Sequence, residues 1–155
     1  MPLEVVLFEQ DKNALAHAFR RLTPSVDARF PGRVRLVFLH DSIKRLLRDG
    51  SLFGPFGKFD LIYSAGLYDY LPDGLARRLT ARLLQMLRPS GRLVIANFVP
   101  GGSGRGYMEL FMDWTLVLRN EAAMRDLSFA AGAAQVNTFH DPHRNVVYVE
   151  VERPW

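Results

Sequence analysis

Cysteine is absent from the 155-residue sequence, so disulfide bonds, thiolate metal ligands and cysteine nucleophiles are excluded from its chemistry. Long apolar runs are missing as well, because no stretch reaches the roughly 18 apolar residues that a membrane-spanning helix needs. Residues 1–7 carry no basic flank of the kind that opens a secretory signal. These absences lead us to expect a cytoplasmic protein without a membrane span.

The composition is that of a globular domain, with 48% hydrophobic and 23% charged residues. At this length we expect one domain with a single core over residues 1–155. The net charge of +4 raises the question of nucleic acid. Basic residues such as Arg20, Arg77 and Arg78 stand beside apolar residues at helical spacing, which is typical of solvated helix faces. Nucleic-acid binding is therefore not favoured.

The hydrophobic pattern alternates predicted strands and helices along the chain. Strands are predicted at residues 4–8, 34–39, 59–64, 92–98, 134–139 and 145–151. Helices are predicted at about residues 14–22, 43–47, 73–87, 108–119 and 121–129. Pro24, and Pro31 with Gly32, mark a loop, and residues 88–91 should stop the helix at 73–87. This order predicts one α/β fold with a largely parallel sheet, and a turn at residues 140–143 predicts an antiparallel last strand.

Polar side chains follow three of the predicted strands, in the groups Glu9 with Asp11, Asp41 with Ser42, and residues 64–70. Ligands of open parallel sheets bind at the carboxyl ends of the strands, so these groups are the candidate site. Asp11 is also placed to cap the first helix, and Asp41 or Ser42 to cap the second. The histidines are isolated in turns without ligand spacing, so no metal site is predicted.

Four segments together resemble class I, S-adenosylmethionine-dependent methyltransferases. They are FEQDKNALAHA (8–18), HDSIKRLL (40–47), FDLIYSAGLYDYLPD (59–73) and LLQMLRPSGRLVIANF (83–98). The resemblance implies a Rossmann-like methyltransferase sheet, S-adenosylmethionine as the cofactor and methyl transfer to a small, partly apolar molecule.

The resemblance also implies how the adenosine half of the cofactor is held. Glu9 would accept hydrogen bonds from the two ribose hydroxyls, and Asp41 would accept one from the adenine amino group, with Ser42 beside it. Gln10 would lie against the adenine or the ribose. The plainer interpretation is that Glu9 interacts with a helix dipole and that Asp41 is only a cap.

Ser64, Ala65 and Gly66 would face the methionine part of the cofactor, where glycine allows a close approach of backbone. Amino-group methyltransferases often have Asn or Asp followed by two prolines here. The sequence Ser-Ala-Gly-Leu at 64–67 departs from that pattern, so amine methylation of that type is not supported.

The acceptor pocket is expected to use aromatic and methionine side chains, namely Tyr68, Tyr70, Tyr107, Met108 and Trp114. The stripe formed by residues 108–114 is more often typical of a helix packed in the core. Asp69 would act as a base if the acceptor is a hydroxyl. An ionised acceptor would need little acid or base chemistry.

A second resemblance suggests the acceptor. IYSAGLYDYL (62–71) and GYMELFMDWTLVLRNEAAMRDL (106–127) are similar to bacterial methyltransferases that form 3-hydroxypalmitic acid methyl ester. This resemblance implies that the acceptor is a carboxylate such as that of a hydroxy fatty acid.

One part of the methyltransferase pattern is missing from this sequence. The resemblance implies a sheet with the strand order 3-2-1-4-5-7-6, in which the opening strand is central and ends in a G-x-G-x-G loop. No glycine occurs before Gly32, however, and residues 4–8 match the second strand. The glycines at 102, 104 and 106 are interpreted as a lid loop. The sequence leaves open a natural protein cut short, a strand supplied by another chain, and a degenerate domain, so whether the isolated chain is an enzyme stays undecided.

The missing strand also predicts assembly. An open edge beside residues 4–8 favours a homodimer or a partner that supplies a strand. Alternatively, the strands at 4–8 and 59–64 close up beside each other and leave a monomer. A non-catalytic interaction module and an RNA-binding methyltransferase relative are the alternative functions.

Overall fold

The computed structural model describes residues 3–101 and 115–153, and the chain divides into two compact units. Unit 1 is Met1–Leu52 and unit 2 is Phe53–Trp155. Each unit has its own sheet, of two and four strands respectively. That residues 1–155 act as a single domain stays a prediction.

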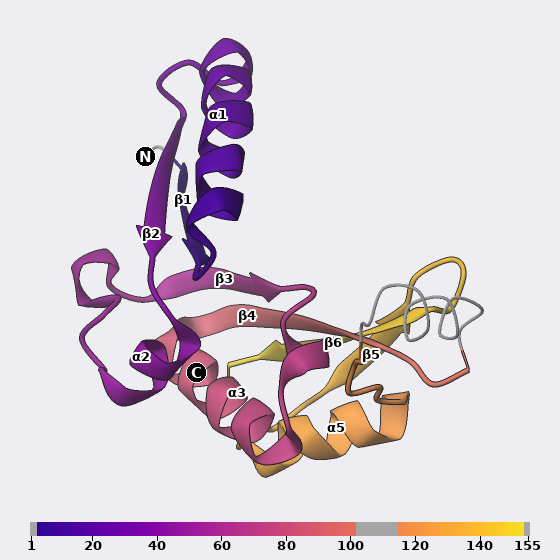
Figure 1. The fold of residues 1–155 in the computed structure, drawn as a ribbon. Coiled ribbons are helices and arrows are strands. Elements are labelled where there is room, and N and C mark those ends of the chain that lie inside the picture. The colour runs from indigo at the N-terminus through magenta and orange to yellow at the C-terminus, as the bar shows by residue number, and fades with distance from the viewer. Residues whose placement is uncertain (1–2, 102–114, 154–155) are drawn as a thin grey trace. The chain divides into compact units, whose positions relative to one another are not determined.

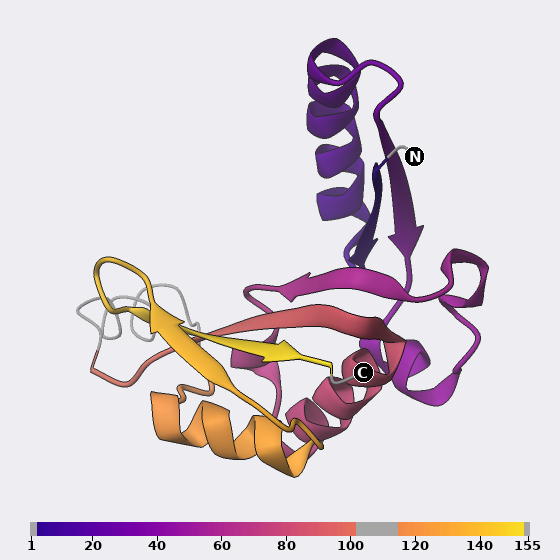
Figure 2. The same cartoon turned by 180° about the vertical axis from the view of Figure 1, so that it is seen from behind.

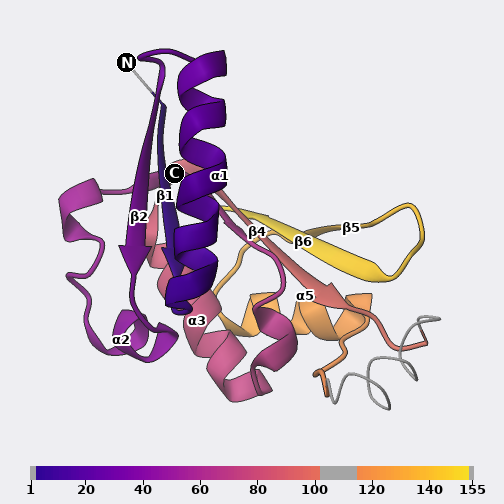
Figure 3. The same ribbon diagram turned by 45° about the horizontal axis from the view of Figure 1, so that its top comes forward.

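Unit 1 is a parallel pair of strands with a long helix packed against it (Figures 1 and 3). Its elements are β1 (Leu3–Glu9), α1 (Lys12–Arg29), β2 (Val34–His40) and α2 (Ile43–Arg48). The register runs from Leu3 opposite Val34 to Glu9 opposite His40. The carboxyl ends of both strands therefore lie side by side.

Helix α1 is longer than the sequence predicted, because it continues through Pro24 to Arg29. Proline lacks the N–H that would bond one turn back, which costs about 3 kcal/mol in a helix interior. The half-buried face of the helix nevertheless continues past Pro24 with Val26. The Ser25 hydroxyl donates to the carbonyl of Arg21 at 3.0 Å, and the Phe30 N–H closes the helix on Val26 at 2.8 Å. The loop predicted at Pro24 is thus wrong.

Unit 1 buries little apolar surface. Among its described residues, the buried hydrophobic side chains are Leu15 and Leu46. By contrast, the exposed fractions of Leu3, Val5 and Phe19 are 61%, 36% and 52%. A two-stranded sheet in water is marginal without substantial packing on its faces. Unit 1 therefore contributes little stability of its own.

Unit 2 contains a mixed sheet in the order β3-β4-β6-β5. Its elements are the short 3-10 turns η1 (Gly54–Phe56) and η2 (Tyr68–Tyr70), strand β3 (Phe59–Ser64), helix α3 (Asp73–Met86), strand β4 (Leu87–Phe98), helix α5 (Glu121–Ala130), and strands β5 (Asn137–His140) and β6 (Val146–Glu152). Strand β3 is parallel to β4, and β6 is antiparallel to β4 and β5. The predicted hairpin and antiparallel last strand are confirmed.

Helices α3 and α5 cover one face of this sheet (Figures 1 and 2). The core between them consists of side chains that are at most 1% exposed, namely Leu79, Leu93, Ile95, Met124, Val147, Val149 and Val151. Alternate residues point to the opposite face. There Tyr63 is 60% exposed, and Phe139 stacks on Tyr148 with ring centroids 4.9 Å apart. Unit 2 thus has one well-packed face and one open face.

The strand order confirms the predicted fold class. The order β2-β1 in one sheet and β3-β4-β6-β5 in the other is the order expected from the resemblance with its first strand left out. Strands β1 and β3 belong to different sheets in the described part of the chain. The alternative in which residues 4–8 and 59–64 close up beside each other stays a prediction, because these two strands lie in different units.

Helix α3 ends at Met86, as the prediction that residues 88–91 stop this helix requires. Strand β4 nevertheless begins at Leu87, earlier than the predicted start at Arg92, so residues 88–91 belong to the strand. The Ser90 N–H donates to the carbonyl of Arg153, and the Arg153 N–H donates to the carbonyl of Gly91, both at 2.9 Å. A Cβ on Gly91 would stand 2.9 Å from the carbonyl oxygens of Arg88 and Phe59. Gly91 therefore allows close backbone approach within the sheet, and does not mark its end.

The helix predicted at residues 108–119 is wrong in its described part, because residues 115–119 are not helical. The Val117 N–H donates to the carbonyl of Asp69 at 2.7 Å, and the Arg119 N–H donates to the carbonyl of Phe98 at 3.0 Å. These amides bond to distant parts of unit 2 and so cannot form a helical ladder. Residues 108–114, and the glycines at 102, 104 and 106, lie outside the described residues.

Within residues 3–101 and 115–153, no helix has the length and apolar character required to cross a membrane.

Amide hydrogen exchange should separate the two units. We expect the amides of Val5 and Val37 to exchange at least about 100-fold faster than those of Ile95 and Val149, since unit 1 has little buried surface to keep its strands closed. Exchange followed by NMR on the intact chain measures both sets at once. Equal protection of the two sets would contradict this account of unit 1.

Candidate functional site

Glu9 and Asp41 lie together at the carboxyl end of the β1–β2 pair. The Asp41 N–H donates to the carbonyl of Glu9 at 3.2 Å, which extends the pairing one residue beyond the strands. One oxygen of the Glu9 carboxylate accepts the N–H of Asp11 at 2.8 Å. A carboxylate has about four acceptor positions, so Glu9 keeps capacity for other donors. The exposed Gln10 lies next to Glu9, and its carbonyl bonds to His40 Nε2 at 3.1 Å.

The two helix caps next to this site come from other side chains. Asp11 caps α1 by accepting the N–H groups of Asn13 and Ala14 at 2.8 and 3.3 Å. Ser42 caps α2 by accepting the Arg45 N–H at 3.2 Å. Because Asp11 and Ser42 cap the two helices, helix capping does not explain why carboxylates stand at positions 9 and 41.

Asp41 is oriented by its own neighbours. Its Oδ1 accepts the N–H of Ser42 at 2.8 Å, and its Oδ2 pairs with Arg45 Nη1 at 2.8 Å. The Asp41 side chain is 15% exposed and that of Arg45 50%. Two partly solvated carboxylates with defined orientation therefore stand on adjacent strand ends in unit 1.

In unit 2, the chain turns sharply after β3. Gly66 has a φ of +76°, a conformation that strains other residues, and nothing lies within 4 Å of where its Cβ would be. Ala65 and Gly66 are exposed and Ser64 is half-buried. These three residues thus leave backbone accessible at the carboxyl end of β3. The placement of Ser64 together with Glu9 and Asp41 stays a prediction, because they lie in different units.

Tyr68 and Tyr70 differ in their surroundings. Tyr68 has no exposed surface, and its hydroxyl lies 2.8 Å from Thr80 Oγ1. Since the Thr80 hydroxyl donates to the carbonyl of Ala76, Tyr68 must be the donor to Thr80. Burial raises the pKa of Tyr68 far above its usual value. Tyr70 is 49% exposed, so of these two candidates for the acceptor pocket only Tyr70 presents surface.

Asp69, the predicted base, is 2% exposed. Its Oδ1 accepts the N–H of Phe98 at 2.7 Å, and its carbonyl accepts the N–H of Val117. Burial raises the pKa of Asp69, while the Phe98 N–H and the nearby Arg119 oppose that shift. These contacts tie η2 to the end of β4.

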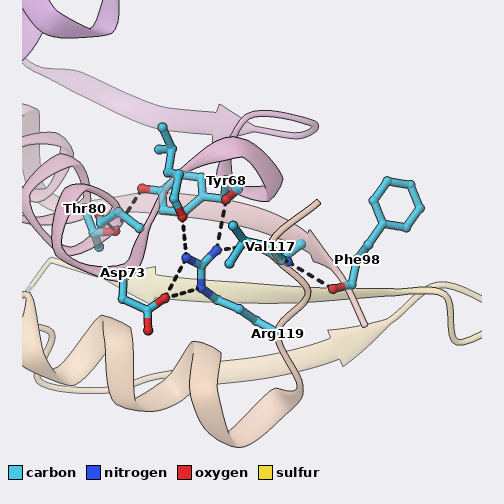
Figure 4. A network of polar contacts seen from close by, with 9 residues as sticks. Tyr68, Asp73, Thr80, Phe98, Val117 and Arg119 are labelled. Atoms are coloured by element: carbon cyan, nitrogen blue, oxygen red, sulfur yellow. Dashed lines mark hydrogen bonds and ion pairs between the residues drawn. The ribbon is translucent and has the colours of Figure 1, made fainter. Parts of the chain in front are cut away.

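Arg119 completes a buried polar cluster that the sequence did not reveal (Figure 4). Its guanidinium donates to Asp73, to Asn97 and to two backbone carbonyls around η2. These partners are 22 to 51 residues distant in sequence, so no local pattern could have indicated them. Tyr107, Met108 and Trp114, predicted for the acceptor pocket, lie outside the described residues.

No group of three or more acidic or histidine side chains able to hold a metal ion was found in the part of the chain that the structure describes.

Several of the solved structures that resemble this chain are methyltransferases. The chain is similar to a possible exported protein from Bordetella parapertussis, with a TM-score of 0.71, 22% identity, and coverage of 98% of this chain and 54% of that one. It is similar to the S-adenosylmethionine-dependent methyltransferase SibL in its apo form, with a TM-score of 0.69, 15% identity, and coverage of 100% and 44%. It is also similar to human N-acetylserotonin methyltransferase in complex with S-adenosylmethionine. The TM-score is 0.68, the identity is 14%, and the match covers 98% of this chain and 41% of that one.

These likenesses establish the fold: the chain has the class I methyltransferase fold. It spans about half the length of these three proteins. No protein-family model matches the sequence. No curated protein matches it either.

The pH dependence of stability should report the burial of Asp69. Because the folded state holds this proton more tightly than the unfolded state, the wild-type chain loses stability as pH rises from below the usual Asp pKa through the raised value. Asp69→Asn keeps an oxygen for the Phe98 N–H and removes the charge. The free energy of unfolding of Asp69→Asn minus that of the wild-type chain should therefore increase as the pH is raised from about 3 to about 7.

Urea denaturation at a series of pH values measures this difference. Asp60→Asn is the matched control, because Asp60 is exposed and pairs with Arg88 at 3.1 Å on the surface of the same unit. A difference between Asp69→Asn and wild type that stays constant with pH would contradict the assignment.

Proposed function

We propose that this chain acts in S-adenosylmethionine-dependent methyl transfer, with unit 1 contributing the adenosine-binding carboxylates. The observation that carries the proposal is the pair Glu9 and Asp41, oriented at adjacent strand ends in a class I methyltransferase fold. Ligands of open parallel sheets bind at this end of the strands. A non-catalytic interaction module and an RNA-binding protein have no comparable support.

The residues present fit the adenosine half of the cofactor. Glu9 would accept the ribose hydroxyls and Asp41 the adenine amino group, with Gln10 and Ser42 beside them. In unit 2, the backbone of residues 64–66 would face the methionine half, where the positive φ of Gly66 keeps the turn open. When bound, the cofactor supplies the methyl group that is transferred.

For the acceptor, we propose a small, partly apolar molecule with an ionised carboxylate, such as a hydroxy fatty acid. An ionised oxygen attacks without a base, so alignment and exclusion of water supply most of the catalysis. This agrees with Asp69, whose carboxylate is buried and bonded to the Phe98 N–H. Tyr70 would contact the acceptor, because it is exposed on the same turn.

Binding of adenosine tests the proposal. We expect adenosine and S-adenosylhomocysteine to bind this chain with similar weak affinity. Glu9 and Asp41 reach only the half that the two share, and residues 64–66 alone, without the G-x-G-x-G loop of the family, should add little for the methionine half. Glu9→Gln should weaken adenosine binding about tenfold, since it removes a charged acceptor from two hydrogen bonds. NMR titration, followed at the amides of residues 9–11 and 41–43, measures the dissociation constants.

Glu4→Gln is the matched control, because Glu4 lies on the same strand and pairs with exposed Arg35 at 2.7 Å. It should leave adenosine binding unchanged. Equal loss in both variants, or no change at residues 9–11 and 41–43, would refute the adenosine site. Micromolar affinity for S-adenosylhomocysteine, with much weaker adenosine binding, would show that this chain also holds the methionine half.

We further propose that the chain pairs with a second copy through an open strand edge. Exposed Leu61 and Tyr63 on β3 favour coverage by another chain. Light scattering at micromolar concentration should give about 35 kDa, twice the 17.6 kDa of one chain. Leu61→Lys should lower this mass, whereas Leu22→Lys on α1 should not. A monomeric mass for the wild-type chain would contradict the pairing.

A further inference from the structure

The turn that carries the exposed Tyr70 is fixed from several sides. Its Tyr68 hydroxyl is tied to Thr80 on α3, and its Asp69 carboxylate to the N–H of Phe98 on β4. The Asp69 carbonyl accepts the N–H of Val117 at 2.7 Å. Turn η2 is thus bonded to a helix, a strand and the segment before α5. Tyr70 is the one member of this three-residue turn whose side chain is exposed.

Arg119 stands at the centre of this arrangement, and all five of its N–H groups have acceptors. Nε and Nη2 donate to Asp73 Oδ1 at 3.0 and 2.7 Å. Nη1 donates to the carbonyl of Tyr68 at 2.9 Å and to Asn97 Oδ1 at 2.8 Å. The second Nη2 proton goes to the carbonyl of Leu71 at 2.5 Å.

This pattern distinguishes Arg119 from a ligand-binding arginine. The residue is 3% exposed, and each of its donors is already used within unit 2. Two of its acceptors are the carbonyls of Tyr68, the first residue of η2, and of Leu71, the residue that follows the turn. Figure 4 shows the guanidinium between the carbonyl of Tyr68 and the carboxylate of Asp73, at the start of α3.

We propose that Arg119 is a positioning residue, whose guanidinium locks η2 in one conformation and thereby fixes Tyr70 at the carboxyl end of β3. A planar fork of donors suits this task, because it reaches carbonyls in two directions while pairing with one carboxylate. A lysine in its place keeps the charge but supplies fewer donors in no fixed plane. The statement that Tyr70 meets the acceptor rests on the proposed function, whereas the locking of the turn does not.

Amide exchange tests the lock without cofactor or acceptor. In Arg119→Lys, we expect the amides of Leu71, Phe98 and Val117 to exchange about tenfold or more faster, because each of them bonds to η2. The amides of Ile95 and Val149, which lie further along the β4–β6 pairing, should change much less. The ring resonances of Tyr70 should also shift or broaden, since the turn then samples more than one conformation.

Val149→Ala is the matched control, because it removes fully buried side-chain volume from the same unit at a distance from η2 in sequence. It should accelerate exchange throughout the β4–β6 pairing and leave the Tyr70 resonances unchanged. If Arg119→Lys instead accelerates all amides of unit 2 by one factor, Arg119 only stabilises the unit, and the proposal is overturned.

A second variant covers the case in which Arg119→Lys does not fold. Asp73→Asn removes the charge that pairs with Arg119, at a side chain that is 67% exposed, so the fold should tolerate it. It should accelerate hydrogen exchange at the amides of Leu71, Phe98 and Val117 by a smaller factor than Arg119→Lys does. Unchanged exchange at these amides would overturn the proposal, even if adenosine binds as expected. Faster exchange there would support the proposal, even if adenosine does not bind.

Discussion

The backbone hydrogen bonding of parallel strands is the constraint on which the rest of this structure depends. A strand inside a sheet needs a partner on each side, because every unpaired N–H and carbonyl group costs free energy when it is removed from water. Among the described residues, β1 pairs only with β2, and β3 pairs only with β4. Each sheet therefore ends in a parallel strand with one open edge.

The consequences differ between the two units. Unit 2 has α3 and α5 over one sheet face and a core that includes Ile95 and Val149. Its polar groups at the end of β4 are also satisfied, because Arg119 and Asn97 bond to each other and to the backbone around them. Unit 1 has neither a comparable core nor a comparable network in its described part. The carboxylates proposed for adenosine thus stand on the less stable of the two units.

Local sequence patterns predicted much of this fold, since periodicity reflects which side chains are buried. Strand β3 and the start of α3 lie where alternation and Pro72 placed them. The prediction at Pro24 is wrong, because proline is a typical helix break although α1 continues through it. The predicted start of β4 at Arg92 is also too late, because Pro89 and Gly91 are typical of positions outside a strand although β4 includes both. The positions of Glu9 and Asp41 followed from strand ends. The role of Arg119 could not be predicted, because its acceptors are set by the packing of distant segments.

The low burial in unit 1 bears directly on ligand affinity. If only a fraction of molecules has β1 and β2 in the binding-competent arrangement, the apparent dissociation constant rises by the reciprocal of that fraction. A strand that pairs with the open edge of β1 would increase the fraction and tighten adenosine binding without touching adenosine. By thermodynamic linkage, adenosine would in turn favour that pairing by the same factor. Completion of the sheet and the proposed binding at Glu9 and Asp41 would therefore be coupled through the stability of unit 1.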